Sequence, residues 1–318
     1  MTFQVNAFGP SNVQGIYRIV EADDGKLWFY AVEYGGNDIW NFDPTTGAMT
    51  KIFSTGVGDY IVDVASNGAG TQWTTYVLSG NPAHDFYSFN DAGVHGANLG
   101  TNPDSLGRNG IIYTAGVLLG SSYWYGYFTG GTDASTGGVL WLNNPTNITF
   151  LDCIGPSGLV YGRNSSELKI TKVDPATGTE TIIYTSSTPL STVASDGTNV
   201  WTFDGTNVLV ISPTGTLLHS YTLSSPFIYT LMCYRPHDGL MYVTGPTSSG
   251  PNMPLYSIDS SGVIVAEMLS IYSVIAVTPD SFICYGDGKT MYIGTSYSSS
   301  FAQLLQLIES QNHIVMVI

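Results

Sequence analysis

The sequence predicts an all-β fold, a seven-bladed β-propeller built of four-stranded antiparallel blades. Two observations predict this fold class. A strand-like phrase that ends in a tight turn occurs seven times along the 318 residues, and its first copy is residues 39–47. An aromatic residue precedes each copy, and the 264 residues from Trp28 to Tyr292 contain six intervals with a mean of 44. Four short strands in a repeat of this length are typical of one propeller blade.

The two phrases define the expected blades. The aromatic residue near the start of each second strand is Trp28, Trp73, Trp124, Tyr161, Trp201, Tyr242 or Tyr292. The third strand and its turn follow at residues 39–47, 86–93, 140–145, 170–178, 209–215, 255–262 and 305–310. We therefore expect a single domain over residues 1–318, with blades at about 10–58, 59–104, 105–154, 155–189, 190–226, 227–275 and 276–318.

Local chemistry supports each element. Apolar and polar residues alternate with period two inside the expected strands, and Gly, Asn, Asp and Pro occur every 8 to 12 residues between them. One blade does not bury both of its faces alone, so blades stack, and the aromatic residues are expected to pack between neighbours. The turn Asp-Pro-x-Thr-Gly at 43–47 and 174–178 uses Pro to fix φ, Asp to accept hydrogen bonds and Gly for a positive φ. We therefore interpret these aspartates as turn formers rather than catalytic groups.

The last blade has two candidate outer strands. The tail at residues 312–318 reads as one, and the head at residues 2–7, within a segment 1–9 that would close the ring, reads as the other. The sequence leaves both open. No long amphipathic helix is expected, and the repeat assigns residues 301–309 to a strand.

Composition excludes several classes of protein. With 13% aromatic residues the chain has too much surface to bury for a disordered protein. Nine Lys and Arg against 24 Asp and Glu, a formal net charge of −15, exclude a nucleic-acid binder. No apolar run reaches the length of a membrane-spanning helix, so we expect no membrane insertion. The first residues show no export signal, and the cysteines Cys153, Cys233 and Cys284 are expected to be buried thiols.

The repeat resembles a known family. Residues 23–29 (Asp-Asp-Gly-Lys-Leu-Trp-Phe), 37–39 and 43–47 are similar to the repeat of streptogramin (virginiamycin B) lyase-like seven-bladed propellers. The resemblance implies histidines and a glutamate around a magnesium ion, where the innermost strands begin. Here those starts contain no histidine: 14–17, 59–62, 109–112, 191–194 and 228–231. The five histidines lie at other repeat positions, so the lyase activity is not transferred, and we expect no catalytic residue, no metal and no cofactor.

Other catalytic motifs are missing from the sequence. It contains no Gly-x-Ser-x-Gly elbow, phosphate loop or His-Glu-x-x-His. Residues 196–199 and 204–207 have oxygen ligands at a calcium-like spacing, but both stand where the repeat requires a hairpin turn. We interpret both as turns.

The loops between second and third strands are the expected recognition face. They vary in length, and those at 128–138 and 245–254 are long and rich in Gly, Ser and Thr. Such loops on a rigid scaffold suit uncharged polar surfaces such as glycans. The candidate ligand-binding residues are Tyr34, Asp133 and Tyr297 in these loops and Tyr17, Tyr60 and Tyr229 near the channel mouth. The alternative for the tyrosines is half-buried packing between blades.

These features favour a non-enzymatic binding or structural module. Few charges, many uncharged polar residues and no export signal fit a component of a virus or phage particle, such as a tail, fibre or capsid-surface protein released by lysis. Its expected partners are other virion proteins or a cell-surface glycan or protein. The alternatives are a divergent lyase or hydrolase and a cytoplasmic interaction scaffold.

Overall fold

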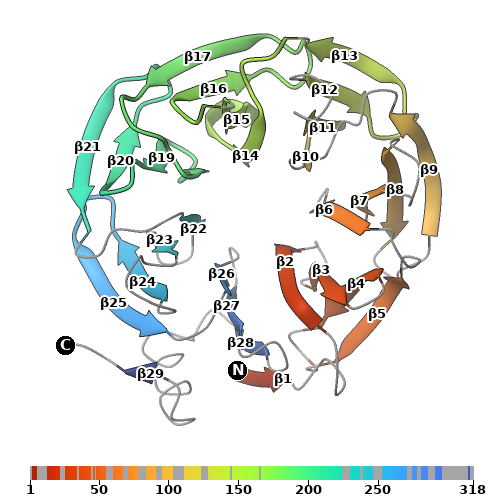
Figure 1. Cartoon of the computed structure of the whole chain (residues 1–318), viewed down its shortest axis with the longest axis horizontal. Helices are drawn as coiled ribbons and strands as arrows, with labels where there is room; N and C mark the ends of the chain where they lie inside the picture. The colour runs from red at the N-terminus through yellow and green to blue at the C-terminus, as the bar shows by residue number, and fades with distance from the viewer. Residues whose placement is uncertain are drawn as a thin grey trace. The chain divides into compact units, whose positions relative to one another are not determined.

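Strands make up almost all of the regular structure in the computed structural model (Figure 1). The one helix among the described residues is a single 3-10 turn at Pro156–Gly158, and no described helix is long and apolar enough to cross a membrane. The structure describes residues 2–5, 13–21, 26–33, 36–43, 46, 48–54, 60–66, 71–77, 84–90, 95–102, 111–122, 128–143, 145–164, 166–223, 230–236, 239–245, 253–270, 274–277, 281–285, 291–295 and 314–315.

The chain comprises two compact units, which are described separately. Unit 2 contains residues 13–43 and 48–187, and unit 1 contains residues 1–12, 44–47 and 188–318. Both consist of antiparallel sheets in which consecutive strands pair with one another. This is the meander expected for propeller blades.

The described residues of unit 2 form four sheets of four strands each, coloured from red to green in Figure 1. The first is β2 (Val13–Glu21), β3 (Leu27–Glu33), β4 (Gly36–Phe42) and β5 (Met49–Ser54). The second is β6 (Tyr60–Ser66), β7 (Thr71–Val77), β8 (His84–Asn90) and β9 (His95–Asn102). The third is β10 (Ile111–Thr114), β11 (Val117–Ser122), β12 (Phe128–Asp133) and β13 (Val139–Asn143). The fourth is β14 (Phe150–Ile154), β15 (Val160–Arg163), β16 (Lys169–Val173) and β17 (Glu180–Thr185).

Unit 1 contains three further sheets among its described strands. One is β18 (Val193–Ser195), β19 (Val200–Phe203), β20 (Asn207–Ile211) and β21 (Leu217–Thr222). The next is β22 (Leu231–Arg235), β23 (Leu240–Thr244), β24 (Met253–Ile258) and β25 (Ile264–Ser270), to which β29 (Ile314–Val315) adds a fifth strand. The last is β26 (Val274–Val277), β27 (Ser281–Tyr285) and β28 (Met291–Thr295), with β1 (Thr2–Val5) as its fourth strand.

The head of the chain therefore completes the last sheet. Strand β1 pairs antiparallel with β28, with Thr2 opposite Gly294 and Val5 opposite Met291. The tail strand β29 pairs instead with β25 of the preceding sheet, where Val315 lies opposite Leu269. This resolves the choice that the sequence left open. The expected strand at 301–309 lies outside the described residues.

Two parts of the repeat alignment are wrong. In the third sheet, residues 128–133 form the third strand, so residues 140–145 include most of the fourth strand and not the third. In the last sheet, Tyr292 lies in β28, which is the third strand. The boundary expected near residue 155 also falls after β14, which pairs with β15 in the fourth sheet.

The third sheet was misread because its third strand lacks large side chains. The sequence Phe-Thr-Gly-Gly-Thr-Asp of β12 looks like a loop. In the structure Gly131 leaves room for the indole of Trp141, since a Cβ there would lie 2.5 Å from that ring. Glycine in a strand interior often marks such a close approach.

Side chains from consecutive sheets form shared apolar cores. In unit 2, Trp28 is fully buried and clusters with Ile39 of its own sheet and with Ile61 and Val64 of the next. In unit 1, Trp201 lies in one cluster with residues of the neighbouring sheet such as Tyr256. Burial between sheets is thus confirmed for Trp28 and Trp201. The side chain of Trp73 lies outside the described residues. So does Trp124, and its predicted place near the start of a second strand is wrong, because the second strand of the third sheet is β11, which ends at Ser122.

The turns have the predicted geometry. Asp174 Oδ1 accepts a hydrogen bond from the amide of Ala176 at 2.8 Å, and Gly178 has a φ of +71°. Asp196 Oδ1 accepts from the amide of Thr198 at 2.8 Å, and Asp204 Oδ1 accepts from the amide of Thr206 at 3.0 Å. These aspartates hold hairpin turns, as the sequence indicates.

Candidate functional site

The structure places only part of the predicted recognition face. Tyr34, Tyr229 and Tyr297 lie outside the described residues. Tyr17 lies within β2 and Tyr60 is the first residue of β6, both first strands of their sheets, and their side chains are not described. The binding roles of these five tyrosines remain predictions.

Asp133 lies at the end of its sheet opposite to the predicted recognition loops, which connect second and third strands. It is the last residue of β12, so it begins the turn between third and fourth strands and not a loop between second and third strands. In an antiparallel sheet these two connections leave opposite ends. The predicted long loop at 128–138 is consequently a strand followed by a short turn.

Hydrogen bonds within that turn occupy the Asp133 carboxylate. Its Oδ1 accepts from the hydroxyl of Ser135 at 2.6 Å and from the amides of Ser135 and Thr136 at 2.9 Å each. These hydrogen bonds lower the pKa of Asp133 to about 2. The Ser135 hydroxyl makes the largest contribution, and the amides of Thr136 and Ser135 make smaller ones. The carboxylate is therefore ionised at neutral pH and stabilises the turn.

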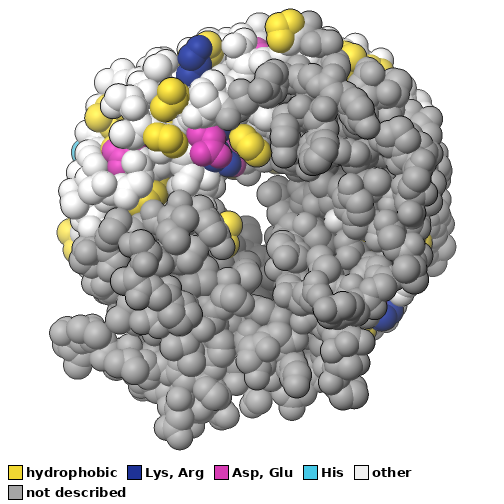
Figure 2. Space-filling model, viewed as in Figure 1, with side chains coloured by type: hydrophobic (Ala, Val, Ile, Leu, Met, Phe, Trp, Pro, Cys, Tyr) yellow, Lys and Arg dark blue, Asp and Glu magenta, His cyan; other side chains and the backbone are white. Residues whose placement is uncertain are grey.

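A shallow polar groove lies between the third and fourth sheets of unit 2. It has a volume of about 520 Å³. The end of β13 and the loop after it line one side, and the turn before β17 lines the other: Leu142, Asn143, Pro145, Thr177, Gly178, Thr179 and Glu180. Where the face seen in Figure 2 is described, most atoms belong to the backbone or to uncharged polar side chains. Among the described residues that line the groove, Glu180 is the only charged one.

Hydrogen bonds from the opposite side of the groove fix Glu180. Its Oε1 accepts from Asn143 Nδ2 at 3.0 Å and from the Thr146 hydroxyl, and its Oε2 accepts from the Asn147 amide at 2.7 Å. Asn143 Nδ2 also donates to the Gly178 carbonyl at 2.7 Å. These contacts join two sheets, so the groove lining is held in place without a ligand.

Next to the groove, the indole of Trp141 packs against the turn that contains Pro175 and Gly178. Its indole N–H donates to the Pro175 carbonyl at 2.8 Å. A Cβ at Gly178 would lie 2.5 Å from the ring, so glycine is needed there for the close approach as well as for its positive φ. Trp141 on the outer strand β13 of the third sheet thus covers the turn before β17 in the fourth sheet.

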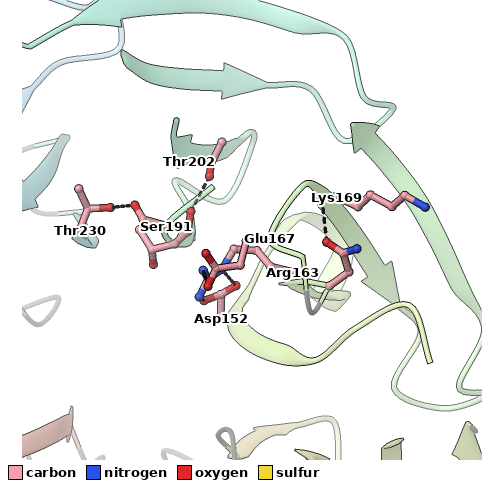
Figure 3. A network of polar contacts seen from close by, with 9 residues as sticks. Asp152, Arg163, Glu167, Lys169, Ser191, Thr202 and Thr230 are labelled. Atoms are coloured by element: carbon pink, nitrogen blue, oxygen red, sulfur yellow. Dashed lines mark hydrogen bonds and ion pairs between the residues drawn. The ribbon is translucent and has the colours of Figure 1, made fainter. Parts of the chain in front are cut away.

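An ion cluster forms around the buried Arg163 in the fourth sheet (Figure 3). Arg163 at the end of β15 binds Asp152 of β14 through two hydrogen bonds of 2.9 and 3.1 Å, and Glu167 at 3.2 Å. Burial lowers the pKa of the Arg163 guanidinium, but the carboxylates of Asp152 and Glu167 outweigh it and hold that pKa above its ordinary value. Sequence reasoning missed this cluster, although an arginine that ends the apolar strand Val160–Arg163 was a usable signal.

The described histidines lie on different strands, and the described residues form no metal centre. His84 begins β8, while His95 and His219 lie in the fourth strands β9 and β21. The His219 ring stacks on Tyr221 with centroids 5.7 Å apart. Among the described residues, no group of three or more His, Cys, Asp or Glu side chains is placed to hold a metal ion.

The comparisons with known proteins define the fold. The chain matches no protein-family model and no curated protein. Many solved structures match it, and with its four-stranded antiparallel sheets the chain is a β-propeller.

Three solved structures illustrate the likeness. Virginiamycin B lyase from Staphylococcus aureus has a TM-score of 0.62 and 14% identity, over 93% of this chain and 99% of that chain. A chain of the mitotic checkpoint complex has a TM-score of 0.66 and 11% identity, over 92% and 94%. The β-propeller domain of the Trilobed protease from Pyrococcus furiosus has a TM-score of 0.61 and 8% identity, over 94% and 99%. At such identities the resemblance, including that to the streptogramin lyase, is one of fold alone.

Proposed function

We propose that this chain is a non-enzymatic, seven-bladed β-propeller that serves as a binding module of a virus or phage particle. The described strands form seven sheets, which supports seven blades. The composition, with only 10% charged residues and many uncharged polar ones, supports a component exposed on the surface of a particle. In this role the protein is part of a tail, a fibre or the capsid surface.

The groove between β13 and β17 carries the proposal of binding. Asn143 Oδ1 and the hydroxyls of Thr177 and Thr179, which bond one another at 2.9 Å, offer neutral polar groups, and the donors that hold Glu180 keep its carboxylate in a fixed position. Neutral hydrogen-bonding groups on a rigid surface complement the hydroxyls of a glycan. Leu142, which is 41% exposed, offers an apolar contact to a sugar ring. The ligand class is therefore a neutral glycan of a cell surface.

An array of neutral glycans tests this assignment. The purified full chain is expected to bind, and Thr177→Val with Thr179→Val is expected to weaken binding about tenfold, because two hydroxyls are lost at nearly constant volume. Thr214→Val is the matched control, since Thr214 lies in the corresponding turn of another sheet. Added salt should have little effect on a neutral ligand. Equal binding by both variants, or no glycan bound, would refute the groove as the site.

The particle itself tests the second part of the proposal. Antibodies against the chain should label particles released by lysis from the source cells in immuno-electron microscopy. Labelling confined to cell cytoplasm would contradict a virion role and favour a cytoplasmic scaffold.

The alternative function is that of a divergent lyase or hydrolase. The fold likeness to virginiamycin B lyase is the observation that favours it. Incubation with virginiamycin B and Mg²⁺, followed by mass spectrometry, measures opening of the lactone. We expect no turnover, and turnover lost on changing one side chain would replace the binding proposal with an enzyme.

A further inference from the structure

The hydrogen bonds around the groove leave a small and definite set of polar groups for a ligand. Asn143 Nδ2 donates both of its protons, to the Gly178 carbonyl at 2.7 Å and to Glu180 Oε1 at 3.0 Å. Because both partners are acceptors, they fix the orientation of the amide, and Asn143 Oδ1 is its remaining acceptor. No donor among the described residues bonds to this oxygen, so it is available to a ligand.

Glu180 has one acceptor position left. Its Oε1 accepts from Asn143 Nδ2 and from the Thr146 hydroxyl, which together use both lone pairs of that oxygen. Its Oε2 accepts from the Asn147 amide at 2.7 Å and, within the described part of the chain, from no other donor. One lone pair of Oε2 is therefore free, on a carboxylate that three donors hold in a fixed position.

The two threonines of the turn leave one side-chain donor free. The Thr177 hydroxyl donates to Thr179 Oγ1 at 2.9 Å, and its oxygen accepts from the Thr179 amide at 3.2 Å. The proton of the Thr179 hydroxyl is thus not used inside the turn, and Thr179 is exposed. This hydroxyl is available to an acceptor of the ligand.

Apolar surface lies beside these polar groups. Leu142 is 41% exposed, Pro145 is exposed as well, and both line the groove. Charge sets a further limit, because Glu180 and the formal net charge of −15 repel a carboxylate or a sulfate. A ligand that uses the whole lining therefore combines a donor, an acceptor and a small apolar group, and carries no negative charge.

We propose that the groove selects sugars that carry an acetamido group, such as N-acetylglucosamine. The N–H of this group donates to Glu180 Oε2, and a neighbouring ring hydroxyl donates to Asn143 Oδ1. Its carbonyl accepts from the Thr179 hydroxyl, and its methyl contacts Leu142 and Pro145. A plain hexose has a hydroxyl in place of the acetamido group, so it leaves part of this apolar surface in water. The inference rests on the proposed function, since it names the class of glycan that the same groove binds.

Matched pairs of sugars test this selection. The methyl glycosides of N-acetylglucosamine and glucose, and those of N-acetylgalactosamine and galactose, differ only in the acetamido group. Each is titrated into the full chain, and NMR chemical shifts give its dissociation constant. In at least one pair the acetamido sugar should bind about tenfold more tightly, because its carbonyl gains the Thr179 donor and its methyl leaves water. The methyl glycoside of glucosamine tests whether a positive charge alone is sufficient.

Two leucine variants of β13 locate the preference in the groove. Leu142→Ser should bring the affinity ratio of the two members of a pair from about tenfold to about threefold, because the methyl contact is lost. Leu140→Ser is the matched control, since Leu140 is 49% exposed on the same strand and is not part of the groove lining, and it should keep the ratio. The ratio is measured within one variant, so a smaller folded fraction does not imitate the effect. An unchanged ratio in Leu142→Ser would overturn the assignment.

The remaining outcomes separate this inference from the proposed function. Equal binding within both pairs would keep the groove as a glycan site and overturn the acetamido selection. The same holds if neither acetamido sugar binds while the array shows another neutral glycan. Tighter binding of the glucosamine glycoside than of its acetylated form would overturn the selection in favour of a cationic ligand for Glu180. If no sugar of either pair binds and the array is also empty, the proposed function is wrong together with this inference.

Discussion

Replacement of Gly178 by alanine tests how the third and fourth sheets are joined. Gly178 has a φ of +71°, a conformation that costs an L-residue about 1–2 kcal/mol. The new Cβ would also lie 2.5 Å from the Trp141 ring, so the indole must move. Moving it breaks the 2.8 Å hydrogen bond to Pro175, worth about 1 kcal/mol, and exposes apolar surface worth about 1–2 kcal/mol. The expected loss of unfolding free energy is about 3–5 kcal/mol in total.

Gly158→Ala provides a matched control. Gly158 has the same φ of +71° and belongs to the same unit, but a Cβ there meets nothing within 4 Å. Its loss should be about 1–2 kcal/mol, from the backbone conformation alone. Urea unfolding followed by tryptophan fluorescence measures both variants. Losses that agree within about 0.5 kcal/mol, the usual scatter of surface substitutions, would show that Trp141 does not rest on Gly178.

Three other substitutions test the core, a turn and the ion cluster. Trp201→Ala should lower the unfolding free energy by about 3–5 kcal/mol, and an unchanged urea midpoint would contradict its burial between sheets. Asp133 should titrate by NMR with a pKa of about 2. Because its folded pKa is lowered, its contribution to stability is present above about pH 4 and is lost towards pH 2, so Asp133→Asn should flatten the pH dependence of unfolding in that window. Arg163→Leu should cost about 3–5 kcal/mol at neutral pH, because the largely buried Asp152 carboxylate loses two hydrogen bonds and its counter-charge; an effect below about 1 kcal/mol would refute a structural role for the cluster.

The sequence predicted the sheets and turns where side chains carry the signal. Trp28 and Trp201 are large and apolar at matching repeat positions, and both are buried as predicted. The aspartates at 174, 196 and 204 accept the turn hydrogen bonds that their residue type and position indicate. Such features depend on a few neighbouring residues, so the local sequence is sufficient.

Features that depend on distant residues were missed. Gly131 is part of a strand because Trp141 fills the space over it, and the strand alone does not reveal that. The groove requires Asn143 and Glu180 to approach each other from different sheets.

The pairing of β1 with β28 has a consequence for synthesis of the chain. Thr2 and its partner Gly294 are about 290 residues apart, so the first strand leaves the ribosome long before the strand it must pair with. At about 5–20 residues per second this delay is roughly 15–60 s. Throughout that time the backbone N–H and C=O groups of β1 have no native partner and are open to chaperones or to other nascent chains. The yield of native protein should therefore change with translation speed and temperature, and by more than expected for a protein whose first strand pairs with a neighbour in sequence.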